Sequence, residues 1–419
     1  MNGLYLKREI IAFDLKSFFA TCECIDQGLD PFTTPLVVCD PTKKGAIILA
    51  VSPYLKSLGV PGRCRAYELP KNIKIIKTKP RMSLYIKKSQ EVINVYLDFV
   101  ALEDLYIYSI DEVFLDATDY LSFYKKTTDE LTLLILKTIT EKTGLTAVAG
   151  IGPNMLLAKI AMDLEAKKNP LHFAHWTYED IPDKLWTIAP LSKMWGIGYR
   201  MEKRLNALNI YKVYDLAHYD KNLLKDKFGV MGEELWMRAN GIDLTKIKEI
   251  KKEPKEKSFN HSQVLYQDYY AHNIPLIILE MVEVLTKRLR ESKKLCLVIG
   301  FGISYSKRIG GGFYHSLKLA TPTKNHQLIY QTCMNLFDKY YNDSPIRKVS
   351  ISLAALTNDD GIQLSLFETL EEINHYQSTY AAIDLIKAKY GKNSIVKASS
   401  LLKDSTAIIR NQKIGGHHE

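Results

Sequence analysis

Tyr106-Ile-Tyr-Ser-Ile-Asp-Glu-Val-Phe-Leu-Asp-Ala117 holds a Ser-Ile-Asp-Glu core between two apolar, β-prone runs. This pattern predicts a β-hairpin with acidic residues at its tip. Adjacent residues of a regular strand face opposite sides, so Asp111 and Glu112 can act on one target only if the chain turns there. Their hard carboxylate oxygens suit Mg²⁺, which is commonly shared with substrate phosphates. A solvated acidic turn is the alternative, because an Asp-Glu pair alone is common.

A third carboxylate ends an earlier apolar run, Glu9-Ile-Ile-Ala-Phe-Asp14, which also reads as a short strand. Three acids at strand ends suit a two-metal site. In such sites two ions about 3.5–4 Å apart activate an attacking oxygen and stabilise the leaving one in phosphoryl transfer.

Two segments carry these acids in longer motifs, Phe13-Asp-Leu-Lys-Ser-Phe-Phe-Ala-Thr-Cys-Glu23 and Ser109-Ile-Asp-Glu-Val-Phe-Leu-Asp116. Together they resemble the Y-family of translesion DNA polymerases, and most of all its UmuC-like branch in Gram-positive bacteria, their phages and plasmids. The resemblance extends over nearly the whole chain up to Phe367. It implies a template-directed, Mg²⁺-dependent DNA polymerase of translesion type, active in DNA damage tolerance and repair. Primer–template DNA and deoxyribonucleoside triphosphates would be its partners.

The resemblance also assigns site residues. The carboxylates of Asp14, Asp111 and Glu112, with the main-chain carbonyl of Leu15, correspond to the ligands of two Mg²⁺ ions. Lys159, in Ala-Lys-Ile-Ala, matches a lysine that meets the triphosphate; a solvated helix lysine is the alternative without the family context. The other nucleotide-binding residues that it implies are Phe18, Phe19, Tyr54 and Lys56.

Phe19 stands five residues after Asp14, at the position of the family's steric gate against ribonucleotides, whereas Phe18 is expected to pack against the palm. The chain departs from part of the family because Pro53 occupies the place of a frequent tyrosine and Tyr54 is shifted by one. Triphosphate contact by Tyr54 therefore stays open. On the same alignment, Ile47 and Leu49 lie over the templating base, in a tighter pocket than in the most lesion-tolerant members.

The predicted fold class is α+β, a multidomain right-hand polymerase with a ferredoxin-like palm, small fingers, a helical thumb and a β-α-β-β-α-β little finger. Without a Pro- and Gly-rich insertion, the first part of the chain follows the split β-α-β order of ferredoxin-like folds. The predicted boundaries are palm 1–17 and 81–170, fingers 18–80, thumb 171–243, linker 244–257, little finger 258–358 and tail 359–419.

Apolar spacing predicts the individual elements. In the palm it indicates a helix from residue 82, a second helix from about 129 to 142 that stops before Gly144, and a strand at 145–151. In the little finger it indicates strands at 258–267, 295–305, 312–319 and 347–356, with helices at 274–290 and 326–340.

The segment Pro190-Leu-Ser-Lys-Met-Trp-Gly-Ile-Gly-Tyr-Arg200 resembles the turn of a helix-hairpin-helix. Gly196 and Gly198 allow a tight turn, so that amides at the start of the next helix can face a DNA phosphate. A Gly-x-Gly loop often only connects two helices, but its position after a polymerase-like palm favours DNA contact. Lys257 and Ser258 begin a segment similar to the family's opening of the little finger, a DNA-gripping domain, and follow a charged linker.

Gln363-Leu364-Ser-Leu366-Phe367 matches the short Gln-Leu-x-Leu-Phe form of bacterial sliding-clamp ligands. The alternative is an edge strand or a core anchor of the tail. Clamp binding would raise the effective concentration of a polymerase that releases DNA easily.

The 419 residues are too many for one ordinary core and suggest about three domains. The net charge of +10 favours a polyanionic partner such as nucleic acid. Six cysteines without paired Cys-x-x-Cys spacing indicate reduced, packed thiols. No signal-like or membrane-spanning run is present, so we expect a cytoplasmic protein without a membrane partner.

Two other functions use parts of the same pattern. A nucleotidyl cyclase can share the palm and its metals, but would need neither the helix-hairpin-helix nor a second β-α-β-β-α-β domain. A non-catalytic DNA-bound accessory factor could keep the fold, but the presence of all three acids argues against it.

Overall fold

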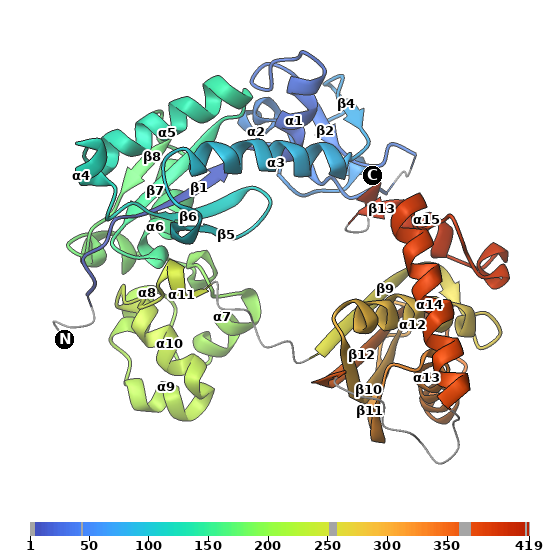
Figure 1. Cartoon of the computed structure of the whole chain (residues 1–419). Coiled ribbons are helices and arrows are strands. Elements are labelled where there is room, and N and C mark those ends of the chain that lie inside the picture. Colours follow the sequence, from blue (N-terminus) through green and yellow to red (C-terminus); the bar gives the residue numbers. More distant parts are fainter. Residues whose placement is uncertain (1–4, 43–44, 251–257, 360–369, 415–416, 419) are drawn as a thin grey trace. The chain divides into compact units, whose positions relative to one another are not determined.

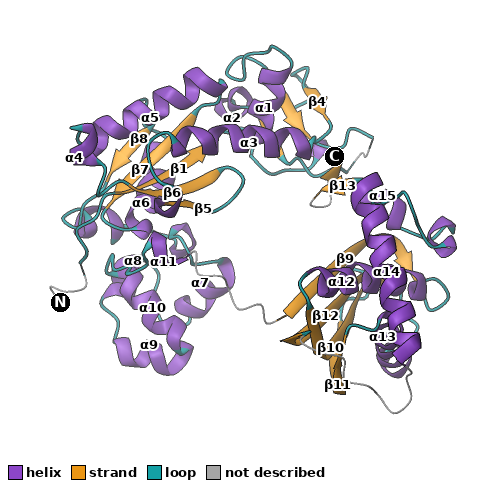
Figure 2. Ribbon diagram, in the orientation of Figure 1, coloured by secondary structure: helices purple, strands orange, loops and turns teal. Residues whose placement is uncertain are grey.

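The computed structural model describes residues 5–42, 45–250, 258–359, 370–414 and 417–418. The chain divides into two compact units, the first of residues 1–252 and 417–419 and the second of residues 253–416. Figures 1 and 2 show the elements of each unit. Within the described residues, no helix has both the length and the apolar character needed to cross a membrane.

A five-stranded sheet forms the centre of the N-terminal unit, built from β1 (Ile10–Leu15), β5 (Leu105–Ile107), β6 (Glu112–Asp116), β7 (Ala147–Gly152) and β8 (Phe173–His175). Its strand order is β5-β6-β1-β7-β8. β6 is antiparallel to both β5 and β1, and so lies between two strands that run the same way. This confirms the predicted split β-α-β arrangement, to which β8 adds an edge strand parallel to β7.

Different helices cover the two faces of this sheet. Ile11, Phe13 and Leu15 of β1 share a core with α3 (Met82–Leu97) and α5 (Thr128–Thr143), which are seen in Figure 1. Ile10 and Ala12 belong to the cluster on the other face, with α6 (Met155–Ala161). Because strand residues alternate, Asp14 belongs to the face that α6 covers.

The ends of α5 show why this helix forms where the sequence predicts it. Thr127 caps the N-terminus: its hydroxyl accepts a hydrogen bond from the N–H of Glu130, whose carboxylate accepts one from the N–H of Thr127. Gly144 follows the last turn at φ 71°, a left-handed conformation that favours glycine. The predicted end of the helix before Gly144 is confirmed.

The insertion between β1 and α3 has a sheet and a core of its own. Its elements are α1 (Phe18–Asp26), β2 (Leu36–Val38), β3 (Ala50–Val51), α2 (Pro53–Ser57), the 3₁₀ turn η1 (Ala66–Glu68) and β4 (Ile76–Thr78). Val37, Ile48 and Leu55 belong to a separate apolar cluster. α1 instead contributes Cys22 and Cys24 to the palm core, so fingers and palm share packing. All six cysteines are free, and all but the half-buried Cys64 are buried.

Helices follow the palm as α7 (Tyr199–Asn206), α8 (Val213–Ala217), α9 (Lys221–Phe228), α10 (Val230–Ala239) and α11 (Ile247–Ile250). The shorter pieces of this unit are η2 (Leu102–Asp104), α4 (Leu121–Tyr124), the π-helical turns η3 (Met162–Ala166) and η4 (Ile181–Leu185), and η5 (Leu191–Lys193).

α11 lies inside the segment predicted as a linker from residue 244. Ile247 is buried in the cluster on the α6 face of the palm sheet, and Lys248 forms ion pairs of 3.3 Å with Glu103 and Asp104. The apolar Ile247 and Ile250 within the charged run explain this anchor, so the start of the linker prediction was wrong. Residues 251–257 lie outside the described part of the chain.

The C-terminal unit contains the sheet of β9 (Ser258–Tyr269), β10 (Lys294–Tyr305), β11 (Gly312–Thr323) and β12 (Ile346–Asn358), with α12 (Ile274–Glu291) and α13 (His326–Tyr340). The predicted β-α-β-β-α-β order is confirmed. The strand order is β11-β10-β12-β9, so the fourth strand separates the first two, whereas in the palm the third strand does. Order along the chain does not specify which distant strands pair, and the two domains pair theirs differently.

The segment after β12 continues with α14 (Leu370–Tyr390), η6 (Ala398–Leu401), α15 (Ala407–Asn411), β13 (Lys413–Ile414) and β14 (His417–His418). Its helices pack on the little finger. Arg290 of α12 forms a 2.8 Å ion pair with Asp384 of α14. The buried carboxylate of Glu280 accepts hydrogen bonds from the hydroxyl and the N–H of Thr406. The described part of the tail from residue 378 to Ile414 is therefore part of the C-terminal folded unit.

His326, at the start of α13, gives this docking a predicted pH dependence. Burial lowers the pKa of His326 to about 4, and the nearby Lys397 and Arg290 act in the same direction. In the unfolded chain a histidine keeps its ordinary pKa of about 6.5. Between about pH 6.5 and about pH 4 the histidine of the unfolded chain is protonated, whereas that of the folded chain stays neutral. The free energy of unfolding of the C-terminal unit therefore falls as the pH drops from about 6.5 to about 4, by up to about 3 kcal/mol.

Hydrogen exchange of the α13 amides at pH 7.5 and pH 5 would measure this effect. Tryptophan fluorescence would not report on this unit, because all four tryptophans lie in the other one. We expect faster exchange at pH 5 after correction for intrinsic rates, and a smaller difference in His326→Gln. The exposed His272→Gln is the control. Equal pH dependence in wild type and His326→Gln would contradict the prediction.

Candidate active site

The pairing of β1 with β6 brings the predicted acids to one end of the palm sheet. Asp14 and Glu112 are direct partners in the antiparallel register, and the N–H of Leu15 donates a 3.0 Å hydrogen bond to the carbonyl of Asp111. Cross-strand partners point to the same face, so both carboxylates lie on the face that α6 covers.

The turn between β5 and β6 separates the two neighbouring acids. Ser109 Oγ donates a 2.7 Å hydrogen bond to Asp111 Oδ1 and accepts one of 3.1 Å from the N–H of Glu112. Asp111 therefore stands before the regular strand and lines the adjacent cavity, while Glu112 opens the strand. The predicted hairpin with acids at its tip is confirmed in this respect.

The position of α6 depends on close contact with β7. A Cβ at Gly150 would lie 2.1 Å from the carbonyl oxygen of Ala158, so glycine lets the helix lie directly on the strand. Lys159 is thereby buried, with its Nζ 2.7 Å from Glu112 Oε1 and 3.2 Å from Asp163 Oδ2. Four residues after Asp163, Lys167 has its Nζ 2.8 Å from Asp163 Oδ1 and 2.5 Å from Asp14 Oδ2.

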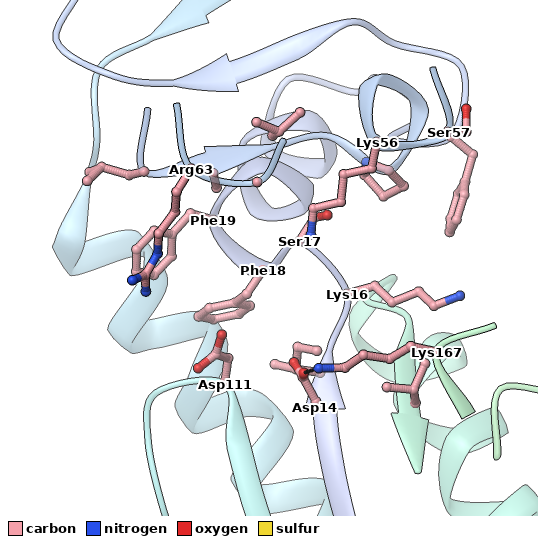
Figure 3. Close-up of a pocket in the computed structure, with 18 of the residues that line it drawn as sticks. Asp14, Lys16, Ser17, Phe18, Phe19, Lys56, Ser57, Arg63, Asp111 and Lys167 are labelled. Carbon is pink, nitrogen blue, oxygen red and sulfur yellow. Dashed lines mark ion pairs between the residues drawn. The ribbon is translucent and has the colours of Figure 1, made fainter. Parts of the chain in front are cut away.

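A cavity of about 950 Å³ opens between the end of the palm sheet and the fingers. Figure 3 shows Asp14 and Asp111 at its base and Lys56 extending into it from the fingers. Four basic residues line it, namely Lys16, Lys56, Arg63 and Lys167. Its size and the number of cations suit a polyanionic small molecule.

Burial changes the ionisation of these groups. It raises the pKa of Asp14, an effect opposed by Lys167 and reinforced by the charge of Asp111. Burial likewise raises the pKa of Glu112, opposed by Lys159 and reinforced by Asp14. The pKa of Lys56 is lowered, first by burial. The carboxylates are thus held in a poorly solvated, mutually repulsive arrangement in which added positive charge is favourable.

The two adjacent phenylalanines have different environments. Phe18 is buried in the palm core, as expected, and also lines the cavity. Phe19 is half-buried, lines the cavity, and stacks on Tyr85 with ring centroids 4.3 Å apart and an interplanar angle of 14°. Tyr85 donates a 2.7 Å hydrogen bond to the buried Glu23, which also pairs with Arg81. The ring of Phe19 therefore rests on a fixed support.

The remaining predicted nucleotide contacts divide into two groups. Lys56 and Leu49 line the cavity, whereas Tyr54 is not among its lining residues and packs against the fingers cluster. Ile47 is exposed on the fingers, outside the cavity lining.

The predicted DNA-contacting turn lies between η5 and α7. Gly196 has φ 92°, and a Cβ there would lie 2.4 Å from a guanidinium nitrogen of Arg238. Gly198 caps α7, and open space surrounds its position. The adjacent Trp195 packs on Tyr108 and Phe114 of the acidic hairpin, at 5.9 and 5.8 Å between ring centroids. This turn is thereby tied to the strand that carries Glu112.

Ser258 opens β9 opposite Ala354 of β12, and its hydroxyl accepts a 3.0 Å hydrogen bond from Asn260. Lys257 lies outside the described residues. So does the predicted clamp motif, Gln363, Leu364, Leu366 and Phe367.

The acids have the donor chemistry that Mg²⁺ prefers, three carboxylates beside a main-chain carbonyl. Among the residues that the structure describes, no group of three or more His, Cys, Asp and Glu side chains is close enough to hold a metal ion. Asp14 and Glu112 each contact a lysine instead. Because the ammonium groups of these lysines already neutralise the negative charge of the two carboxylates, the site fits metal cations, which carry charge of the same sign.

Sequence reasoning missed Lys16, Arg63, Asp163 and Lys167. Lys16 lines the cavity with its Nζ 2.9 Å from His172 Nδ1. Lys159, Asp163 and Lys167 recur every four residues, a spacing that places side chains on one helix face and that could have identified the last two.

Family models match three parts of the chain: the impB/mucB/samB family at residues 13–163, the HHH motif of the IMS family at 178–210, and the impB/mucB/samB C-terminal domain at 256–366. The chain is 39% identical over 98% of both chains to UvrX of Bacillus subtilis, whose name refers to UV-damage repair. It is 32% identical over 99% of both chains to DNA polymerase IV 2 of the same organism.

Among solved structures, a Y-family DNA polymerase chimera of Dbh and Dpo4 is similar with a TM-score of 0.65 and 20% identity, over 84% of this chain and 99% of that one. This likeness confirms the predicted fold class. With the relatives above, it establishes that the chain belongs to the impB/mucB/samB family and is a UmuC-like Y-family DNA polymerase.

Proposed function

We propose that this DNA polymerase performs translesion synthesis in DNA damage tolerance and repair, adding deoxyribonucleotides to a primer 3′-hydroxyl by a two-metal mechanism. The observation that carries the proposal is the register of Asp14 opposite Glu112, with Asp111 beside them at the base of a cation-lined cavity. The name of the relative UvrX, which refers to UV-damage repair, supports the damage-tolerance role.

Asp14, Asp111 and Glu112, with the carbonyl of Leu15, would hold two Mg²⁺ ions. Bound there, the ions supply activation of the attacking oxygen and charge neutralisation at the leaving one. The protein itself needs no nucleophile, because positioning and charge neutralisation carry phosphoryl transfer. Lys56, which already lines the cavity, would bind the triphosphate, and Lys159 would join it on leaving Glu112. Tyr54 would reach the nucleotide only by leaving the fingers cluster.

The DNA contacts belong to the same proposal. The turn with Gly196 and Gly198 would bind the DNA backbone, and Lys257 with Ser258 would do so at the start of the little finger. Such contacts position DNA without reading its sequence. The proposed domain boundaries remain those drawn from the sequence, except that α11 belongs to the N-terminal unit.

Replacing Asp111 by Ala should reduce Mg²⁺-dependent primer extension by a factor on the order of a thousand. The variant loses a metal ligand and, with it, stabilisation of the charge that develops in the transition state. DNA binding, measured by fluorescence anisotropy, should change little. Asp119→Ala, which removes an exposed acid after the same hairpin, is the matched control. Undiminished extension by Asp111→Ala would disprove the catalytic assignment.

Replacing Phe19 by Ala should raise ribonucleotide incorporation far more than it lowers deoxyribonucleotide incorporation. A ring fixed on Tyr85 beneath the sugar leaves no room for a 2′-hydroxyl, and a misplacement of about 1 Å costs roughly a hundredfold in rate. Single-nucleotide insertion rates for both sugars on one undamaged template measure the ratio. Phe123→Ala, at an exposed position on α4, is the control. An unchanged ratio in Phe19→Ala would remove Phe19 from the site.

We also propose that Gln363, Leu364, Leu366 and Phe367 bind the bacterial sliding clamp, with the three apolar side chains as anchors in a small pocket. The double variant Leu366→Ala/Phe367→Ala should lose the stimulation of primer extension by the clamp, with extension in its absence as the reference. Leu401→Ala/Leu402→Ala changes two exposed leucines of the same tail and should keep the stimulation. Equal stimulation of both double variants would count against clamp binding.

A further inference from the structure

An unbroken chain of ion pairs joins two of the proposed metal ligands. It runs from Glu112 to Lys159, on to Asp163 and Lys167, and ends at Asp14, with N–O distances of 2.7, 3.2, 2.8 and 2.5 Å. Asp163 is its centre, since this one carboxylate contacts both lysines. Neither Lys167 nor Asp163 has a role in the mechanism proposed above.

The local backbone explains how one helix face reaches both acids. Lys159, Asp163 and Lys167 are spaced by four residues, but α6 ends at Ala161 and continues as the π-helical turn η3 at Met162–Ala166. A π turn inserts one extra residue and re-aims the side chains that follow it. Lys159, in α6 before this turn, contacts Glu112 on β6, whereas Lys167, which follows the turn, contacts Asp14 on the neighbouring β1.

The two lysines differ in their freedom to move. The side chain of Lys159 is only 6% exposed, whereas that of Lys167 is 39% exposed and lines the cavity. The carboxylate of Asp14, in contrast, is 14% exposed and cannot be satisfied by water alone. Lys167 can thus move into solvent more easily than Lys159, and Asp14 would then need another cation in its place.

We propose that Asp163 positions Lys167 as an internal counterion of Asp14, which holds the site together before metal ions bind and competes with them for that carboxylate. The inference rests on the proposed metal ligands and adds a positioning pair to them. Asp14, Asp111, Glu112 and Asp163 carry four negative charges against the two lysines, so charge remains for divalent cations. Binding of a cation at Asp14 must break the contact with Lys167, and that loss lowers the apparent affinity for the metal.

A purely structural ion pair makes a different prediction. If Lys167 only stabilised the fold, its removal would lower stability with and without metal alike, and metal affinity would stay the same or fall. Competition instead requires that removal of Lys167 destabilise the metal-free protein and at the same time tighten metal binding. Metal affinity in the absence of DNA and nucleotide therefore separates the two roles.

The test uses the full chain and Mn²⁺ as the probe, with binding measured by isothermal titration calorimetry and thermal unfolding measured with and without the metal. Lys167→Met should bind Mn²⁺ about fivefold more tightly, the factor expected when a partly exposed ion pair no longer competes. Its melting temperature without metal should fall, and the rise on adding metal should exceed that of wild type. Lys167→Arg should restore the wild-type affinity.

Lys168→Met is the matched control, because it removes an equal charge from the next, exposed position outside the chain of ion pairs. Asp163→Asn should weaken Mn²⁺ binding. Without the carboxylate of residue 163, Lys159 and Lys167 pair only with the proposed metal ligands Glu112 and Asp14 and compete more strongly with the metal. Affinity in Lys167→Met no higher than in Lys168→Met would overturn the competition. If Asp14→Asn still binds Mn²⁺, the assignment of Asp14 as a metal ligand is itself overturned. If Asp14→Asn loses Mn²⁺ binding but Lys167→Met binds Mn²⁺ as wild type does, only the role of Lys167 is overturned.

Discussion

The antiparallel register of β1 and β6 is the constraint on which the rest of this site depends. It sets Asp14 directly opposite Glu112 and joins Leu15 to Asp111 through the backbone. A slip of one residue would turn Glu112 to the face of α3 and α5. Val113 and Leu115 in one core and Phe114 in the other prevent this slip, since each would move to the wrong side. The apolar residues of β6 thus place the acids.

Positively charged side chains line the cavity or contact its acids from several parts of the N-terminal unit. Lys56 and Arg63 of the fingers and Lys16 after β1 line the cavity. Lys159 of α6 contacts Glu112, and Lys167, just after η3, contacts Asp14. The site therefore concentrates both signs of charge in a small, partly buried volume, where electrostatic interactions are stronger than in water. In the mechanism proposed above, a triphosphate with its cations would enter this volume by exchanging partners, and the lysines that neutralise the acids would then become available to its phosphates.

Much of this architecture was predictable because it depends on local patterns. Apolar spacing predicted α13 at its observed bounds and the strand ending in acid at β1, and the capping signals around Gly144 fixed the end of α5. The strand order of the little finger was not predictable in this way, since it depends on pairing between distant segments. The charged residues around Ile247 and Ile250 hid the docking of α11. The four-residue spacing could have identified Asp163 and Lys167 as neighbours, but no sequence signal predicted the π turn between Lys159 and Lys167.

Release of pyrophosphate tests the central claim most directly, because polymerase, cyclase and accessory factor differ in what they require for it. The purified chain would be supplied with all four deoxyribonucleoside triphosphates, in the presence and absence of Mg²⁺ and of primer–template DNA. The account predicts release only when both are present, with one pyrophosphate for each nucleotide that complements the template. Release without DNA, or none under any of these conditions, would contradict it.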